Sequence, residues 1–146
     1  MKIFIDADGC PVVDITIRIA KQFKLECIIL CDTAHEFNKP DTTSITVSKG
    51  ADSVDFALVN MLNADDVVVT QDYGLAAMCL AKKAVPISQD GMIYNNDNID
   101  SLLLARHTAK KIRMAGGRLK GNAKRTPDQN RAFEESLIEI LSAKQG

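Results

Sequence analysis

Short apolar segments of strand type alternate with segments of helical type over residues 2–88. The predicted strands are KIFID (2–6), LECIILC (25–31), SITVS (44–48), DVVVT (66–70) and AVPIS (84–88). DVVVT is continuous and β-branched, which is typical of a strand covered on both faces. Strands separated by helices are joined in parallel by crossovers. The sequence therefore predicts a Rossmann-like α/β three-layer sandwich with a mainly parallel central sheet.

The expected helices are marked by apolar spacing and by capping residues. The first should begin at Pro11, because a missing N–H costs nothing at the first helical position. Further helices are expected over 52–62, 73–83 and about 99–113. The last should begin at Pro127, because Thr126 and Gln129 form a capping-box pattern in front of an apolar stripe. A length of 146 residues suits one domain, 1–146, with C-terminal helices.

Six acidic residues fall at the same predicted edge of the sheet. They follow the first, fourth and fifth strands or open the helix after the third, and they are Asp6, Asp8, Asp52, Asp55, Asp72 and Asp90. In open parallel sheets, ligands bind outside the carboxyl ends of the strands. Clustered carboxylates repel one another unless a cation neutralises them, and oxygen ligands suit Mg²⁺ or Mn²⁺. The pattern predicts a metal site, although each acid alone could instead be a turn or cap residue.

Charge is distributed unevenly along the chain. Residues 1–100 carry 15 acidic and 8 basic side chains, whereas residues 101–131 carry 1 acidic and 9 basic ones. The candidate phosphate-binding residues of this basic helix-loop segment are Arg106, Lys110, Arg113, Arg118, Lys120, Lys124 and Arg125. Such a stripe favours contact with the backbone of RNA, single-stranded or structured, and the alternative is a solvated helix face. The segment contains no aromatic residue, so it does not predict base stacking or sequence-specific binding.

The N-terminal segment and the cysteines indicate in which cellular compartment the protein is expected. No apolar run approaches the ~20 residues that cross a bilayer, and the N-terminal segment is too short and acidic for a signal peptide. We therefore expect a cytoplasmic protein without a membrane partner. Cys27, Cys31 and His35 are spaced like zinc ligands, but a structural zinc site needs a fourth ligand, so buried thiols are the expected alternative.

Four sequence blocks together resemble one family: IDADGCPV, GADSVDFALVN, DVVVTQDYGLA and KRTPDQNRAFEESL. The chain resembles the uncharacterised bacterial YaiI/YqxD group, which is placed in the PIN-like nuclease superfamily. This resemblance implies a PIN-like fold that holds one or two divalent cations through Asp6, Asp72 and an acid of the central helix, Asp55 or Asp52. It also implies that Thr70 orients a metal ligand. Many PIN nucleases have Glu at the central-helix position, where this chain has Asp.

These features support more than one function. The leading expectation is a Mg²⁺- or Mn²⁺-dependent phosphodiesterase, ribonuclease-like and acting on RNA, with Asp6, Asp55 and Asp72 as catalytic metal ligands. The alternative is a non-catalytic RNA- or ribosome-associated binding module. IFIDADGC also resembles the start of haloacid-dehalogenase-type phosphatases, in which Asp6 would be the nucleophile. That chemistry needs a later acid pair just after a strand, whereas Asp65 and Asp66 precede the fourth strand.

Overall fold

The computed structural model describes residues 1–32, 39–47, 53–116 and 124–145 of the chain. Five strands form one sheet: β1 (Lys2–Asp6), β2 (Glu26–Asp32), β3 (Thr43–Val47), β4 (Val67–Val69) and β5 (Val85–Ile87). The strand order is β3-β2-β1-β4-β5, and every neighbouring pair is parallel. The prediction of a parallel α/β fold is confirmed.

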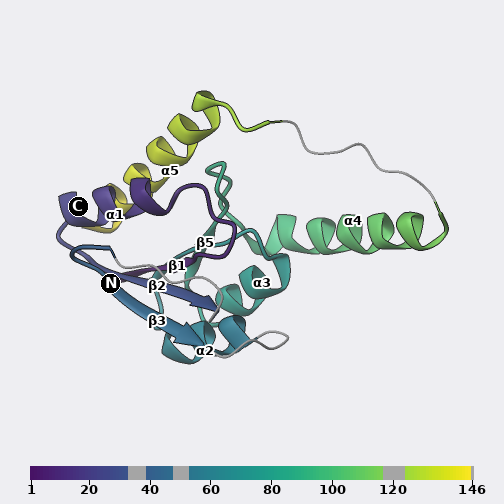
Figure 1. Ribbon diagram of the computed structural model, residues 1–146, viewed down its shortest axis with the longest axis horizontal. Coiled ribbons are helices and arrows are strands. Elements are labelled where there is room, and N and C mark those ends of the chain that lie inside the picture. Colours follow the sequence, from purple (N-terminus) through teal and green to yellow (C-terminus); the bar gives the residue numbers. More distant parts are fainter. Residues whose placement is uncertain (33–38, 48–52, 117–123, 146) are drawn as a thin grey trace.

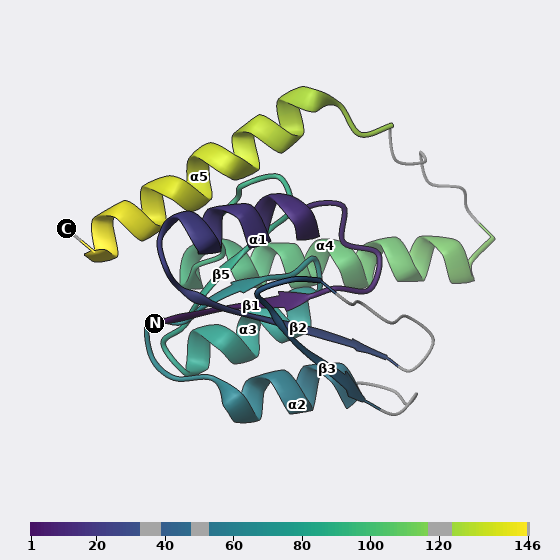
Figure 2. The same cartoon turned by 60° about the vertical axis from the view of Figure 1, so that its left-hand side comes forward.

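The helices are α1 (Val13–Gln22), α2 (Ser53–Met61), α3 (Tyr73–Ala81), α4 (Asn96–Met114) and α5 (Pro127–Gln145). Figures 1 and 2 show α1 and α5 on one face of the sheet and α2 and α3 on the other. The sheet is thus the middle layer of a Rossmann-like three-layer sandwich, as the alternation of segments predicts.

Side chains of β1 alternate between the two cores because successive residues of a strand point to opposite faces. Ile3 and Ile5 pack with α1 and α5, whereas Phe4 packs with α2 and α3. All three are fully buried. A central strand with both faces covered has no room for polar residues until it ends, and β1 ends at Asp6.

Two helices begin elsewhere than predicted. The first starts at Val13 rather than Pro11, because the chain first makes a turn in which the N–H of Cys10 donates to the carbonyl of Ala7 at 3.0 Å. The fourth starts at Asn96, three residues before the predicted Ile99. Asn95 accepts hydrogen bonds there from the backbone of the first turn, and so forms a capping box that the apolar spacing did not indicate.

Helix α4 extends beyond the rest of the molecule. Figures 1 and 2 show its second half pointing away from the sheet and from the other helices. Its first half packs on α3 through Leu102, Leu103 and the buried Ile99. None of the described helices is long and apolar enough to cross a membrane.

Candidate functional site

A cavity of about 380 Å³ lies at the carboxyl ends of β1 and β4. These strands pair with Ile5 opposite Val69, so the next residues, Asp6 and Thr70, emerge side by side from distant parts of the sequence. The lining includes Asp6, Asp8, Thr70, Asp72 and Arg106. Three of the predicted acids therefore share one cavity at the predicted edge of the sheet.

Thr70 connects two of these acids. Its hydroxyl donates to Oδ2 of Asp6 at 2.8 Å and accepts from the backbone N–H of Asp72 at 3.0 Å. The side chain is only 2% exposed, and its backbone carbonyl accepts from the hydroxyl of the buried Tyr94 at 3.1 Å. Thr70 is thus held from both sides and fixes the position of the Asp6 carboxylate relative to the start of α3.

Asp72 has both a structural and an electrostatic role. It is the N-cap of α3, where its Oδ1 accepts from the N–H of Leu75 at 3.1 Å. The same oxygen lies 3.7 Å from a guanidinium nitrogen of Arg106 on α4. The capping alternative considered for this acid is therefore correct in part, but the carboxylate also lines the cavity beside a cation.

The surroundings of Asp6 raise the pKa of its carboxyl group. Burial raises the pKa of its carboxyl group above the ordinary value, and the hydrogen bond from Thr70 opposes this effect. The nearby carboxylates of Asp72 and then Asp8 raise that pKa further. Oδ2 of Asp8 itself accepts from the backbone N–H of Asp32 at 3.3 Å. A cation in the cavity would relieve the repulsion among these three acids.

Asp55 lies in an adjoining cavity rather than in this one. It is 8% exposed in the first turn of α2, and it lines a space of about 260 Å³ together with Asp72 and Arg106. The predicted set of Asp6, Asp55 and Asp72 is therefore divided between two cavities that share Asp72 and Arg106. Across the described ranges, no three Asp, Glu, His or Cys side chains are arranged to hold a metal ion. Asp52 lies outside the described residues.

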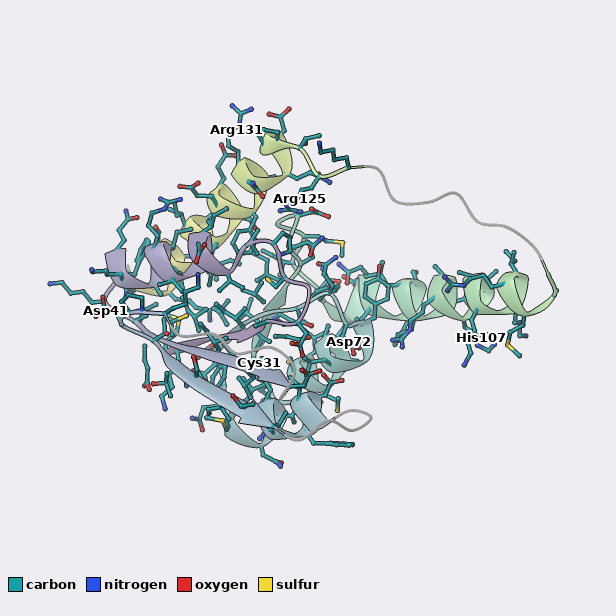
Figure 3. All side chains as sticks on the ribbon, in the orientation of Figure 1. Cys31, Asp41, Asp72, His107, Arg125 and Arg131 are labelled. Carbon is teal, nitrogen blue, oxygen red and sulfur yellow. The ribbon has the colours of Figure 1, made fainter. Side chains whose placement is uncertain are left out.

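Asp90 is not brought into the cavity. Its carboxylate lies 2.7 Å from Nη1 of Arg125, whose guanidinium also donates to the carbonyl of Gln89 and to the side chain of Asn130. Figure 3 shows Arg125 near the start of α5, well apart from Asp72. These contacts join the loop after β5 to α5, so Asp90 and Arg125 have a structural role, and their predicted metal and RNA contacts stay predictions.

The other predicted phosphate-binding residues are distributed along α4 and the following loop. Arg106 lines both cavities, whereas Lys110 and Arg113 are exposed on the projecting half of the helix. Figure 3 shows His107 on the same projecting part. Lys124 is exposed just before α5. Arg118 and Lys120 lie outside the described residues, as does most of the loop predicted between α4 and α5.

Comparison with known proteins identifies the family. Residues 4–143 match a family model described as "Uncharacterized BCR, YaiI/YqxD family". The chain belongs to the YaiI/YqxD family. Similar relatives, each named UPF0178 protein, include one from Exiguobacterium sibiricum that is 53% identical over 144 residues and covers 99% of both chains. Another, from Clostridium acetobutylicum, is 48% identical over 143 residues and covers 97% of both chains. No solved structure matches the chain significantly.

Sequence reasoning missed several residues of the cavity in this member of the YaiI/YqxD family. Tyr73, Gln71, Gln89 and Cys10 also line it. Tyr73 packs edge to face against Tyr94, with ring centroids 6.0 Å apart. The available signal was position alone, since all four residues come within a few positions of a predicted strand end. The structure thus places an aromatic ring near the acids, although the basic segment itself contains none.

The rival sites are not supported in this family member. Asp66 accepts from the backbone N–H groups of Lys2 and Asn63, both at 2.9 Å, and it lies at the amino-terminal edge of the sheet, opposite the cavity. This agrees with the sequence argument against a phosphatase of the haloacid-dehalogenase type. Cys27 and Cys31 are buried free thiols, which is the alternative expected from the sequence, and burial raises the pKa of Cys27 to about 12. His35 lies outside the described residues.

Proposed function

We propose that this member of the YaiI/YqxD family is a Mg²⁺- or Mn²⁺-dependent phosphodiesterase that acts on RNA. The observation that supports the proposal most is the cavity at the carboxyl ends of β1 and β4, where Asp6, Asp8 and Asp72 converge beside Arg106. Carboxylates placed together next to one exposed guanidinium suit a phosphate substrate only if a further cation is present, since the acids otherwise repel a phosphate group.

The donor set fits a hard divalent cation. Asp6, Asp8 and Asp72 supply carboxylate oxygens, and burial together with the neighbouring carboxylates of Asp72 and Asp8 raises the pKa of Asp6. These three residues would hold the ion once their carboxylates move closer together than they are in this structure, and Asp55 would act from the adjoining cavity. When bound, the ion would supply Lewis acidity for the attack of water on a phosphodiester.

Different residues would then position the metal ligand and bind the phosphate groups of the RNA. Thr70 holds the Asp6 carboxylate through a hydrogen bond of 2.8 Å, so this ligand would not have to be ordered when the cation binds. Arg106 stands at the mouth of both cavities and would contact the phosphate group. Lys110 and Arg113 follow at helical spacing on α4 and would contact adjacent phosphates of the RNA backbone.

One observation favours a second candidate, the non-catalytic RNA-binding module. Within the described part of the chain no three acids are positioned to hold a metal ion, and Arg106 already provides a cation beside Asp72. Such a module would bind RNA through α4 without hydrolysing it. The two candidates differ in turnover, not in binding.

Hydrolysis of single-stranded RNA in Mn²⁺ tests the proposal. Wild type should cleave the RNA, whereas Asp6→Asn and Asp72→Asn should lose cleavage and keep RNA binding. Asparagine is a conservative choice because it still accepts from Thr70 at position 6 and is still a good N-cap at position 72. EDTA should abolish the wild-type activity. Equal rates in all three proteins would mean a contaminating ribonuclease and would refute the proposal, and binding without cleavage in wild type would establish the second candidate.

A further inference from the structure

The projecting half of α4 carries an apolar face that the described part of the chain leaves exposed. A shallow hollow on the helix is lined by Ser101, Leu104, Ala105, Thr108, Ala109 and Ile112. Leu104 is 65% exposed and Ile112 is 40% exposed. The six positions recur three and four apart, so they share one side of the helix. This set is called the α4 face below.

The α4 face points away from the body of the molecule. Ile99, Leu102 and Leu103 pack on α3. At 100° per residue, the centre of the α4 face lies about a quarter turn from Leu102 and nearly half a turn from the other two. Residues 104–108 and 110–116 are exposed. A helix end that is exposed all round obtains no support from packing, and most helical stability in proteins comes from the packing of an apolar side. Among the residues that the structure describes, none packs against the apolar side of the projecting half of α4.

The α4 face is complementary in shape to itself. If two copies of α4 run antiparallel about a twofold axis between residues 106 and 107, Leu104 of one copy lies opposite Ala109 of the other. In the same register Ile112 lies opposite Ser101, and Ala105 lies opposite Thr108. Each large side chain thus meets a small one, which allows two helices to pack closely.

The charges beside the α4 face favour the same antiparallel arrangement. Asp100 and Lys111 lie on the flank of the face that also carries Leu104, one in the first half of the helix and the other in the second. A twofold axis places equal flanks next to each other, so Asp100 of one copy comes within about 3 Å along the axis of the level of Lys111 of the other. A parallel pair would instead place this flank of the two copies on opposite sides of the interface, so that Asp100 could not approach Lys111, and would also align the two helix dipoles.

We propose that the α4 face is the interface of a homodimer, in which α4 packs antiparallel against α4 of a second copy. The contact surface of two helices is smaller than the ~1,600 Å² of a standard interface, so the dimer should be weak and concentration-dependent. Arg106 and Lys110 lie on the other side of the helix, so the dimer leaves them available to a ligand. The inference does not depend on the proposed catalytic function.

Sedimentation equilibrium on wild type and on two complementary variants tests the proposal. Leu104→Ala should leave Ala opposite Ala, and Ala109→Leu should force Leu against Leu, each at two symmetric contacts. Either variant alone should have a dimer Kd raised at least about tenfold. An equimolar mixture of the two should recover dimerisation, because in the heterodimer both contacts again pair a leucine with an alanine.

Leu104→Asp and Phe56→Asp are the second pair of variants. Leu104→Asp should remove the dimer. Because Leu104 is exposed, this substitution should leave the monomer folded, which circular dichroism checks directly. Phe56 is 58% exposed on α2, so Phe56→Asp is a matched control that should dimerise like wild type. A wild type that stays monomeric up to about 1 mM, the weak end of specific association, would overturn the proposal. A dimer insensitive to Leu104→Asp, or no recovery in the mixture, would overturn it as well.

Discussion

Replacing Thr70 with valine removes the hydroxyl group that connects two acids of the cavity and keeps the volume of the side chain nearly constant. The half-buried carboxylate of Asp6 loses the hydrogen bond of 2.8 Å, and the N–H of Asp72 loses its acceptor at 3.0 Å. Because Thr70 is only 2% exposed, water cannot readily replace either partner. Hydrogen bonds to a charged group contribute about 1.5–3 kcal/mol and neutral ones about 0.5–1.5 kcal/mol, so the free energy of unfolding should fall by roughly 2–4 kcal/mol.

The loss should depend on pH in a definite direction. The hydrogen bond from Thr70 lowers the pKa of Asp6, whereas burial, the largest effect, raises it above the unfolded value. In Thr70→Val the folded-state pKa should therefore rise further. A raised carboxyl pKa contributes stability that is present below the unfolded pKa and is lost as pH rises through the folded pKa. The difference between wild type and variant should thus be small in acid and widen as pH rises through the folded pKa of Asp6.

Urea unfolding in EDTA, followed by far-ultraviolet circular dichroism at several pH values, measures both effects. Thr70→Ser is the matched control, because it keeps the hydroxyl and loses only a methyl group, which should cost about 1 kcal/mol. A valine variant within about 0.5 kcal/mol of wild type at neutral pH would refute the reasoning, since surface substitutions alone change stability by that much. The same conclusion would follow if serine and valine destabilised the protein equally.

Three further predictions concern the site, RNA binding and a tight packing contact. In EDTA, Asp6→Asn should melt at a higher temperature than wild type because it removes a charge that repels the neighbouring acids. Mn²⁺ should reverse this order by stabilising wild type alone. Scanning fluorimetry with an external dye measures both melting temperatures. Arg113→Glu should weaken RNA binding and make the dissociation constant less dependent on salt concentration. Lys21→Glu, a charge reversal on the distant α1, is the control and should change both only slightly. Fluorescence anisotropy at several salt concentrations measures both. Gly91→Ala should destabilise the fold by about 2 kcal/mol or more, because its φ is +88° and a Cβ would lie 2.6 Å from a carbonyl oxygen of α5. Gly9→Ala, at φ +71° with open space around it, should cost only about 1 kcal/mol in the same urea titration.

The pattern of apolar residues was sufficient to predict the sheet and the edge at which the acids lie. It was insufficient to predict which side chains these acids contact. Val67–Val69 and Ile3–Ile5 are apolar at every position, which indicates strands with two covered faces, and the parallel order follows from the helices between them. The ion pair of Asp90 was not predicted because its partner, Arg125, is 35 positions away and approaches only through the packing of α5.

Local hydrogen bonding also overrode two predictions of helix boundaries. Pro11 is compatible with a helix start, but the preceding turn at Ala7–Cys10, with Gly9 at positive φ, delays the first helical residue to Val13. The start of α4 was predicted too late because the spacing of apolar residues carries no information about the Asn95 cap. The role of Thr70 came from the family resemblance alone, since no periodic pattern distinguishes it from any other residue that follows a strand.

The position of β1 in the middle of the sheet affects how the protein can be synthesised. β1 leaves the ribosome before the other four strands of this sheet, yet one of its two edges pairs with β4, which begins at Val67. Until then the nascent chain exposes a fully apolar strand edge, which is a hazard for aggregation during synthesis. The cavity is also incomplete until β4 has paired with β1, because the residues at the end of β4 form part of its lining. A chain that ends before Val67 still has Asp6, Asp8 and Asp55 but lacks Thr70 and Asp72, and one edge of its β1 strand is unpaired, so truncated products should be insoluble rather than partly active.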